Sequence, residues 1–325
     1  MKALYPIKFT PILQERIWGG DKLVEQFNKP SEKKNLGESW EISGVKGNIS
    51  VVSNGILKGE HLTDLIKTYR GDLVGEKVYK KFGTDFPILI KFIDAKTDLS
   101  IQLHPNDKLA KKRHNSFGKT EMWYVMQADS NGKLIVGFNK EVSKEAYLKH
   151  VENKTLINIL NVDKVSEGDV YFIPTGRIHA IGGGVMVAEI QQTSDITYRI
   201  YDWDRKDSQG NERELHTDLA VDALDYEIQS DYKTEYEKKL NQSSPVVNCK
   251  YFTTNIMAVN DKVKRNYSKV DSFVIYICVK GKVQITTTES SEELYIGETI
   301  LIPAALKEVT IYADEYSELL EVYVG

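Results

Sequence analysis

Short strand-like segments dominate the hydrophobic pattern of the chain. Apolar residues either alternate with polar ones or form brief runs. Val, Ile, Tyr, Phe and Thr are the main residues of these segments, and Gly, Asn, Asp and Ser separate them. Many short strands between turn signals are typical of a β-sandwich or jelly roll. The pattern therefore predicts a mainly β protein, with strands near residues 87–95, 99–104, 121–125, 170–173, 185–191, 197–203, 251–259, 273–279, 282–288 and 319–324.

Helical spacing interrupts this pattern in three places. Residues 62–69 place their apolar side chains at helical intervals. A second helix is expected after a cap at Ser143, and a third after a cap at Thr217. These patches suit insertions on a β framework rather than βαβ units. The polar stretch 228–245, which runs up to Pro245, is the predicted linker.

One internal repeat indicates two related domains. Gly168-Asp-Val-Tyr-Phe-Ile-Pro174 recurs as Gly297-Glu-Thr-Ile-Leu-Ile-Pro303, and the two copies lie too far apart for a solenoid. The first copy continues to His179, whereas the second continues without a histidine. We therefore expect a catalytic, metal-binding β domain with helical insertions at residues 1–240, and a degenerate β domain without metal ligands at residues 241–325.

Composition and charge exclude several classes of protein. The chain has 325 residues, with 43 Lys and Arg against 47 Asp and Glu and a formal net charge of −4. A near-neutral chain without a basic block argues against a nucleic-acid partner. With 41% hydrophobic and 10% aromatic residues, the chain can form a packed core rather than a disordered state.

The sequence carries no sign of secretion or of membrane insertion. Cys249 and Cys278 form no spaced disulfide framework. The N-terminal segment lacks an uninterrupted apolar core and a small-residue cleavage site, and no stretch approaches the roughly 18 apolar residues of a membrane span. We therefore expect a cytoplasmic protein with no membrane partner. The sequence leaves a monomer and a homodimer equally open.

A strand with one polar face carries the first candidate site residues. In Ser100-Ile-Gln-Leu-His104, successive side chains point to opposite faces, so Ser100, Gln102 and His104 share one face. The other face is entirely apolar and should be buried. Pro105 ends the strand because it lacks a backbone donor. The polar face must therefore line either solvent or a polar cavity.

Two further residues extend His104 to a possible set of metal ligands. Glu121 opens the 121–125 strand, and His179 follows the strand and turn of the first repeat. Two imidazoles and a carboxylate, with Gln102 as a weaker oxygen donor, are the ligands of a catalytic divalent metal site with an open position. Zn²⁺ accepts nitrogen and oxygen donors and polarises carbonyl groups. Each histidine alone is best explained as an ordinary one, but the joint pattern favours the metal site.

Three cations accompany these candidate ligands. Lys91 and Arg199 interrupt apolar strands, and Lys119 lies two residues before Glu121. Together these cations could meet a phosphate or a developing oxyanion. The alternative for each is a surface cation at a strand edge or end, which suits Lys91 better than Lys119. Glu189 is a candidate proton carrier, or equally a structural partner of Arg199.

These motifs together resemble one known family. The segment from Gly168 to His179 resembles the second cupin motif. With the remaining motifs, the chain resembles the type I phosphomannose isomerases (mannose-6-phosphate isomerases) in their short bacterial form. The remaining motifs are Trp18-Gly-Gly, Glu38-Ser-Trp-Glu-Ile-Ser43, Ser100-Ile-Gln-Leu-His-Pro105, Gly118-Lys-Thr-Glu-Met-Trp-Tyr124 and Gln191-Gln-Thr-Ser-Asp195 followed by Arg199. The resemblance implies two cupin-type jelly-roll domains with a few inserted helices.

The resemblance also implies a cofactor and a substrate. It implies a zinc-dependent interconversion of mannose 6-phosphate and fructose 6-phosphate, with one Zn²⁺ per chain and a small sugar phosphate as the partner. His104, Glu121 and His179 match the zinc ligands of the family. Gln102 matches a position that is a ligand in longer members, so it ranks lower. The chain has no room between His104 and His179 for the large helical domain of those members.

The implied reaction proceeds through an enediol or enediolate. Arg199 matches the catalytic arginine of the family and would stabilise developing negative charge. Ser100 and Lys119 match substrate-pocket positions, and Lys91 is a further candidate for this pocket. Glu189 is the candidate base that removes the proton next to the carbonyl, with a metal-activated water as the alternative.

Two other classes of function stay open at this point. Two histidines and a carboxylate also form the facial triad of non-haem iron oxygenases, although the cations of the pocket suit a phosphorylated sugar better. A non-catalytic sugar-binding β module is the second rival. It has no need of an open metal site, so the complete ligand set argues against it.

Overall fold

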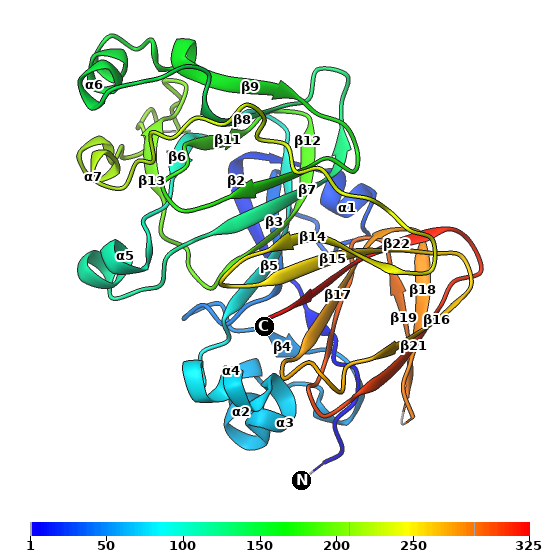
Figure 1. The fold of residues 1–325 in the computed structure, drawn as a ribbon. Helices are drawn as coiled ribbons and strands as arrows, with labels where there is room; N and C mark the ends of the chain where they lie inside the picture. The colour runs from blue at the N-terminus through cyan, green and yellow to red at the C-terminus, as the bar shows by residue number, and fades with distance from the viewer. Residues whose placement is uncertain (1, 208, 289) are drawn as a thin grey trace.

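The computed structural model describes residues 2–207, 209–288 and 290–325 and shows two pairs of antiparallel sheets (Figure 1). The first pair consists of a six-stranded central sheet and a five-stranded outer sheet. The central sheet contains β10 (Val170–Ile173), β7 (Glu121–Ala128), β12 (Val185–Gln192), β5 (Ile88–Ala95), β2 (Ile12–Gly20) and β3 (Leu36–Ile42). The outer sheet contains β13 (Tyr198–Tyr201), β6 (Ile101–Leu103), β11 (His179–Ile181), β8 (Lys133–Phe138) and β9 (Leu160–Lys164).

The second pair is built from the C-terminal part of the chain. The contact sheet, which faces the central sheet, contains β14 (Ser243–Asn248), β15 (Thr253–Val259), β22 (Ser317–Tyr323), β17 (Val274–Lys280) and β20 (Thr299–Ile302). The distal sheet contains β16 (Lys262–Asn266), β21 (Glu308–Tyr312), β18 (Lys282–Thr286) and β19 (Ser291–Tyr295). A small extra sheet pairs β1 (Phe9–Thr10) with β4 (Val51–Val52).

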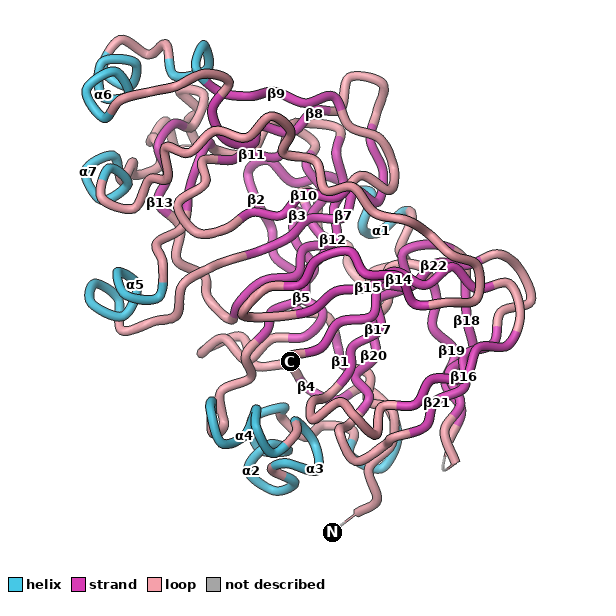
Figure 2. The backbone as a smooth tube through the Cα atoms, in the orientation of Figure 1, coloured by secondary structure: helices cyan, strands magenta, loops and turns pink. Residues whose placement is uncertain are grey.

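Short helices decorate this β framework (Figure 2). They are α1 (Lys22–Glu25), α2 (Leu62–Tyr69), α3 (Gly71–Val74), α4 (Glu76–Phe82), α5 (Asp107–His114), α6 (Lys144–Glu152) and α7 (Thr217–Val221), with 3₁₀ turns at Gly55–Leu57 and Leu156–Ile159. Among the described residues, no helix is long and apolar enough to cross a membrane. The prediction of a mainly β protein with inserted helices is confirmed.

The central sheet is buried on both faces because side chains alternate along its strands. On β5, Ile88, Ile90 and Phe92 pack toward the contact sheet, in a core shared with Ile275 and Leu320. On its other face, Ile93 and Ala95 join a separate core with Leu134 and Val136 of the outer sheet. Lys91 belongs to this second face. The near-continuous apolar run of β5 therefore reflects a strand covered from both sides.

The internal repeat forms equivalent strands in the two halves. Gly168 precedes β10 with φ +90°, and Gly297 precedes β20 with φ +78°. Both backbones thus occupy the left-handed region that glycine adopts without strain. The division of the chain into domains at 1–240 and 241–325 stays a prediction, although every strand of the contact and distal sheets lies after residue 242.

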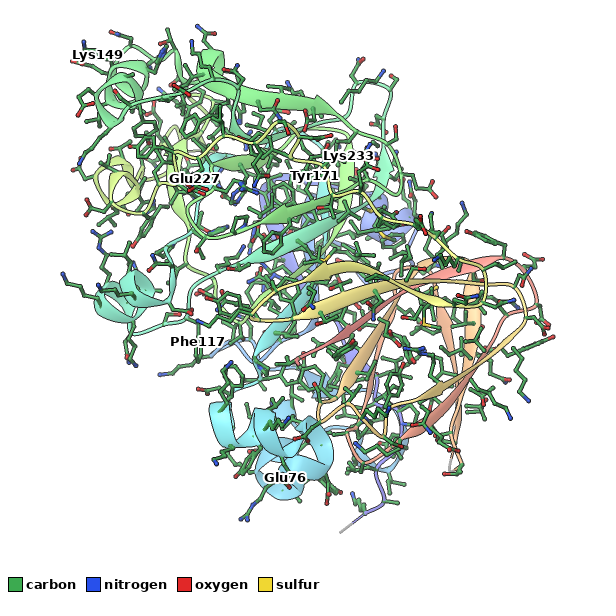
Figure 3. All side chains as sticks on the ribbon, viewed as in Figure 1. Glu76, Phe117, Lys149, Tyr171, Glu227 and Lys233 are labelled. Carbon is green, nitrogen blue, oxygen red and sulfur yellow. The ribbon has the colours of Figure 1, made fainter. Side chains whose placement is uncertain are left out.

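Two local predictions are wrong. Thr217 is the first residue of α7 and not its cap, because His216 occupies the N-cap position and its side chain makes no capping hydrogen bond. The stretch 228–245 is not a free linker. Its Lys233 pairs with Tyr171 in an antiparallel bridge (both labelled in Figure 3), and Pro245 lies inside β14.

Candidate metal centre and active site

A polar cavity of about 370 Å³ lies between the central and outer sheets. Lys91, Trp123 and Glu189 line it from the central sheet, and Gln102 and Arg199 line it from the outer sheet. The sequence-predicted residues along its wall are Lys91, Ser100, Gln102, Lys119, Glu189 and Arg199. The structure therefore brings together the candidate catalytic and substrate-binding residues around one space.

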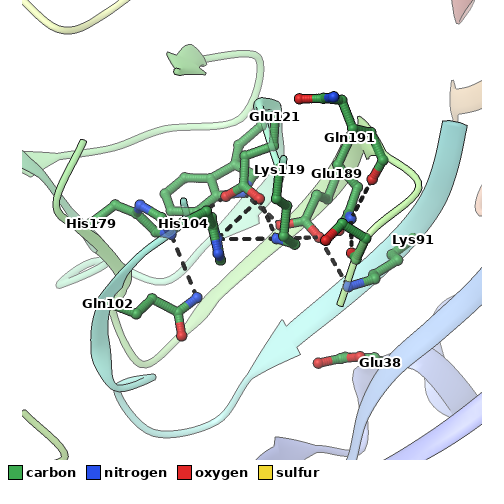
Figure 4. A network of polar contacts seen from close by, with 12 residues as sticks. Glu38, Lys91, Gln102, His104, Lys119, Glu121, His179, Glu189 and Gln191 are labelled. Carbon is green, nitrogen blue, oxygen red and sulfur yellow. Dashed lines mark hydrogen bonds and ion pairs between the residues drawn. The ribbon is translucent and has the colours of Figure 1, made fainter. Parts of the chain in front are cut away.

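His104, Glu121 and His179 form a buried cluster next to this cavity (Figure 4). His104 follows β6, while Glu121 and His179 are the first residues of β7 and β11. Their ligand atoms all lie within 4.8 Å of one another, and none of the three side chains is more than 1% exposed. Three separate strands thus converge on one point.

Both histidines direct the lone pair of their Nε2 atom toward this point. The Nδ1 atoms of His104 and His179 lie 2.8 Å from the backbone carbonyls of Ile196 and Arg177, so each Nδ1 carries the proton. Burial lowers the pKa of His104 well below its usual value, and it lowers the pKa of His179 to about 3. Both rings are therefore neutral, which is the state that binds a metal.

The donor set fits a divalent cation. Glu121 Oε1 is buried without a hydrogen-bond partner among the described residues, and it lies 3.5 Å from His179 Nε2. Burial raises the pKa of Glu121 to about 7, and the nearby Glu189 carboxylate adds to the rise. Two acceptors facing each other in a buried site are unfavourable unless a proton or a cation lies between them. A metal ion would satisfy both atoms.

Lys119 connects the cluster to the cavity. Its ammonium group lies 3.2 Å from His104 Nε2, donates a short hydrogen bond to Glu121 Oε2, and lies 3.9 Å from Glu189 Oε1. Burial alone would lower the pKa of Lys119, but the two carboxylates outweigh it and raise the pKa. Lys119 is therefore a buried donor beside the candidate ligands, and its raised pKa favours the charged form.

Gln102 lies next to the cluster but turns its amide oxygen away from it. Its Nε2 atom is 3.5 Å from His179 Nε2, while its Oε1 accepts from Ser100 Oγ at 3.3 Å. Service as a metal ligand would require the amide to rotate, because only the oxygen can donate electrons to a metal. A ligand role for Gln102 stays a prediction.

Glu189 is held by two lysines and a tryptophan. Lys91 Nζ lies 3.3 Å from its Oε1, and Trp123 Nε1 donates to its Oε2 at 2.9 Å. Burial alone would raise the pKa of Glu189. Lys119 and Lys91 outweigh burial and lower this pKa to about 2. The ion-pair partners of Glu189 are thus these lysines and not Arg199, the partner that the sequence suggested.

Lys91 is not the surface cation that its sequence context favoured. It lies in the middle of β5, is 6% exposed, and stacks its ammonium 4.8 Å from the Trp40 ring. The strand-end interpretation is also wrong, because β5 continues to Ala95. Burial of the Lys91 ammonium is tolerated because it pairs with the Glu189 carboxylate and lies over the Trp40 ring.

Arg199 of β13 lines the cavity, and part of its guanidinium has no hydrogen-bond partner among the described residues. Its Nη1 donates to the Glu214 carbonyl at 2.9 Å, whereas its Nε is buried without a hydrogen-bond partner among the described residues. Burial lowers the pKa of Arg199, and Arg213 nearby lowers it further. The guanidinium is thus placed to donate to an anionic group in the cavity.

The rim of the cavity contains residues to which the sequence assigned no role. Arg16 donates two hydrogen bonds to the Glu38 carboxylate, each 3.1 Å long, in a bidentate pair. Trp40 Nε1 also donates to Glu38, at 2.6 Å. Arg213 pairs with Asp202. Glu38 and Trp40 lie on one face of β3 because side chains alternate along a strand, and this alternation is the sequence pattern that could have located them. Arg213 follows β13 in an irregular segment, where no periodicity could have located it.

Comparisons with known proteins agree with this geometry. Residues 7–133 match the family model for the catalytic domain of type I phosphomannose isomerase, and residues 242–317 match that for the cupin domain of mannose-6-phosphate isomerase. Mannose-6-phosphate isomerase ManA of Bacillus subtilis is 32% identical, covering 97% of this chain and 98% of the relative. A mannose-6-phosphate isomerase of Streptococcus mutans is 31% identical over 93% of both chains.

A solved structure supports the same assignment. The mannose 6-phosphate isomerase of Bacillus subtilis superposes with a TM-score of 0.88 at 31% identity, covering 99% of this chain and all of that one. The identity, the coverage and the buried histidine–glutamate cluster lead to one conclusion. The chain belongs to the type I phosphomannose isomerase family, a family of isomerases.

Proposed function

We propose that the chain is a zinc-dependent aldose–ketose isomerase that interconverts mannose 6-phosphate and fructose 6-phosphate through an enediol or enediolate. The observation that carries this proposal is the buried cluster of His104, Glu121 and His179 beside a cavity lined by cations. Membership of the family, whose curated relatives are named mannose-6-phosphate isomerases, supports the choice of substrate.

One Zn²⁺ per chain would be held by His104, Glu121 and His179, with Gln102 as a candidate fourth ligand. Two neutral imidazoles and one carboxylate are a typical catalytic zinc set. When bound, zinc supplies a Lewis acid that polarises the oxygens of the open-chain sugar. The chain contributes the prearranged donors, since both Nδ1 atoms are already fixed by backbone carbonyls.

The cations of the cavity bind and orient the substrate. A cavity of about 370 Å³ suits one small, highly polar ligand. Arg199 offers its unused Nε to developing negative charge on a sugar oxygen. Ser100, Lys119 and Lys91 hold the phosphate and hydroxyl groups by charge-assisted hydrogen bonds.

Glu189 is the proposed proton carrier. It removes the proton from the carbon next to the carbonyl and returns it to the former carbonyl carbon. The proton of the neighbouring hydroxyl moves to the former carbonyl oxygen, so the sugar gains and loses no atoms. With a pKa of about 2, its carboxylate is ionised but only weakly basic. When a substrate oxygen draws Lys91 or Lys119 away from Glu189, the carboxylate loses a neutralising partner and becomes a stronger base. A water near the metal is the alternative carrier.

We also propose that residues 1–240 form the catalytic cupin domain and residues 241–325 a degenerate cupin-like domain without metal ligands. All three residues of the cluster precede β12, and the contact and distal sheets lie after it.

A coupled assay for fructose 6-phosphate formed from mannose 6-phosphate tests the proposed activity. The assay uses purified full-length protein before chelation, after chelation and after Zn²⁺ is returned. We expect turnover that chelation abolishes and zinc restores. A folded, zinc-loaded protein without turnover would overturn the proposal, and oxygen consumption or sugar binding alone would then identify an oxygenase or a binding module.

A further inference from the structure

Asp107 connects three segments of the chain that meet behind the metal cluster. It is the first residue of α5 and follows His104 closely in the sequence. Its Oδ1 accepts from the backbone N–H of Gly118 and from Gln192 Nε2, both at 3.0 Å. Its Oδ2 accepts from the phenol of Tyr251 at 2.7 Å. One carboxylate therefore receives three donors from distant parts of the chain.

Gln192 extends this connection to the other side of Lys119. Its Oε1 accepts from the backbone N–H of Thr120 at 2.9 Å, and its own N–H donates to the Thr120 carbonyl at 3.0 Å. Gly118 and Thr120 are the two neighbours of Lys119 in the chain. Both neighbours are thus fixed by the Asp107–Gln192 pair.

We propose that Asp107, Gln192 and Tyr251 are positioning residues for the metal centre. They fix the segment Gly118–Thr120 against the loop that follows His104, and so they set where Lys119 and Glu121 lie relative to that histidine. None of the three touches the metal ligands directly. The consequence for turnover rests on the proposed isomerase function, whereas the consequence for metal affinity does not.

Helix capping does not account for the Asp107 carboxylate. Asn106 is the N-cap of α5, and its side chain already accepts from the Leu109 N–H at 3.0 Å. Burial alone would raise the pKa of Asp107, but hydrogen bonds from Tyr251, Gln192 and Gly118 outweigh burial and lower it. The side chain is therefore an ionised acceptor for these three donors, and its Oδ2 also lies 3.7 Å from Lys250 Nζ.

Tyr251 connects the C-terminal part of the chain to the Asp107 carboxylate. It lies between β14 and β15 of the contact sheet, whereas the candidate ligands come from the central and outer sheets. Its hydroxyl reaches Asp107 from outside the sheets that carry the ligands. The contact sheet therefore does more than cover the central sheet, because it supports the backbone on which Glu121 is carried.

The first test removes the carboxylate. Metal-stripped full-length protein is titrated with Zn²⁺ against a chromogenic chelator, and kcat and KM are measured on the zinc-loaded protein. We expect Asp107→Ala to weaken zinc binding about 10- to 100-fold, because loss of a residue that supports metal ligands has this effect. Asp107→Asn should recover most of the affinity, since its oxygen still accepts from Gly118 and Gln192. The control is Asp64→Ala, which removes an exposed acid from the first turn of α2.

The second test removes one donor. Tyr251→Phe should weaken zinc binding about fivefold, less than the full energy of one hydrogen bond to a charged group, because Tyr251 acts on the ligands only through Asp107. Added to Asp107→Ala, it should have no further effect, because its partner is already absent. The control is Tyr295→Phe, which removes the hydroxyl of an exposed tyrosine on β19 that bonds only locally to Glu293.

The inference is overturned if Asp107→Ala and Tyr251→Phe both keep zinc affinity and kcat within twofold of the unmodified chain. It is also overturned if they lower only the melting temperature, since that outcome indicates a purely structural contact. If Asp107→Ala does not fold, Tyr251→Phe still decides the question. A chain that loses zinc affinity as expected but never turns over mannose 6-phosphate would contradict the proposed function and leave this inference standing.

Discussion

Lys91 and Glu189 are directly paired residues of neighbouring strands β5 and β12, and their charged atoms lie 3.3 Å apart inside the cavity. Both side chains are almost completely buried, at 6% and 3% exposure. A buried ion pair contributes little net stability compared with apolar residues of the same size. Stability alone therefore does not explain the pair, and both of its side chains line the cavity. The pair keeps Glu189 ionised, and under the proposed function it offers Lys91 to an anionic substrate.

Replacement of Lys91 should change both substrate binding and the pH profile. Lys91→Met removes a charge that lowers the pKa of Glu189, so that pKa should rise. The acid limb of the kcat/KM profile should then move to higher pH, and KM should increase about tenfold through the loss of one charge-assisted contact. Lys96→Met, which removes an exposed lysine from the segment after β5, is the control. An unmoved acid limb would exclude Glu189 as the titrating group.

Arg199 should affect turnover without affecting the metal. Arg199→Ala removes a donor aimed at the cavity, and loss of such a donor typically lowers kcat about 10²- to 10³-fold. Zinc content, measured by elemental analysis, should stay at one per chain because, among the described residues, no hydrogen bond or ion pair joins the Arg199 side chain to His104, Glu121 or His179. Arg199→Lys keeps the charge and should recover part of the rate. If Arg199→Ala instead releases the metal, the assignment of roles in the cavity is wrong.

Glu121 should be required for metal binding. Glu121→Gln keeps the shape of the side chain but removes the negative charge that faces both histidines. Neutral amides are poor zinc ligands, so we expect zinc affinity to fall about 100-fold or more in a chelator competition. Glu15→Gln, at an exposed acid paired with Lys33, should bind zinc normally. Unchanged zinc affinity in Glu121→Gln would show that the metal lies elsewhere.

The sequence predicted several strands that have a clear period but missed others, including the alternating β21 and the apolar run of β8. β5, β7, β10 and β12 were expected within a few residues, because each has an apolar run or an alternation bounded by turn residues. The strand β2 was missed, since Gln14-Glu-Arg16 breaks its apolar pattern. That strand is irregular in the structure as well, and its register with β3 shifts twice. The formation of such a strand depends on its pairing with neighbouring strands rather than on its local sequence pattern.

The sequence predicted which residues form the candidate site better than it predicted which of them contact one another. Strand alternation placed Ser100, Gln102 and His104 on one face, which the structure shows next to the cavity and cluster. The partner of Glu189 could not be predicted, because it depends on the pairing register of β5 with β12. The support from Tyr251 was also beyond the sequence, since it crosses between two sheets that no local pattern relates.

Gly176 should be irreplaceable in the turn that leads to His179. Its φ is +87°, its N–H donates to the His104 carbonyl at 2.9 Å, and an added Cβ would lie 2.6 Å from the Ala223 carbonyl oxygen. Gly47 has almost the same φ, +88°, but an added Cβ there meets nothing within 4 Å. Both Gly→Ala changes carry backbone strain of about 1 kcal/mol.

The steric contact should make the two glycines differ. Gly176→Ala should lower the free energy of unfolding by about 2 kcal/mol more than Gly47→Ala, because only Gly176 faces packed backbone. Chemical denaturation of both variants and of the unmodified chain measures this difference. Equal losses in the two variants would show that strain alone, and not the contact with Ala223, accounts for the effect.

Glu318 should make the contact between the central and contact sheets sensitive to acid. Its Oε2 accepts from Tyr124 of β7 at 3.0 Å, and Lys238 donates to its Oε1 at 2.9 Å. Burial alone would raise the pKa of Glu318, but hydrogen bonds from Tyr316 and Lys238, with the Lys238 charge, outweigh burial and lower it. A lowered pKa in the folded state means that the ionised carboxylate stabilises the fold above its unfolded pKa of about 4.3.

That stabilisation should disappear as the pH falls through the folded pKa of Glu318. Below about pH 5, and on through the folded pKa of Glu318, the denaturation midpoint of the unmodified chain should therefore fall more steeply than that of Glu318→Gln, which has no proton to gain. Glu315→Gln, at an exposed neighbour in the loop before β22, should follow the unmodified chain. Parallel pH profiles for the unmodified chain and Glu318→Gln would mean that Glu318 is equally easy to protonate in the folded and unfolded states, contrary to its hydrogen bonds from Tyr124, Lys238 and Tyr316.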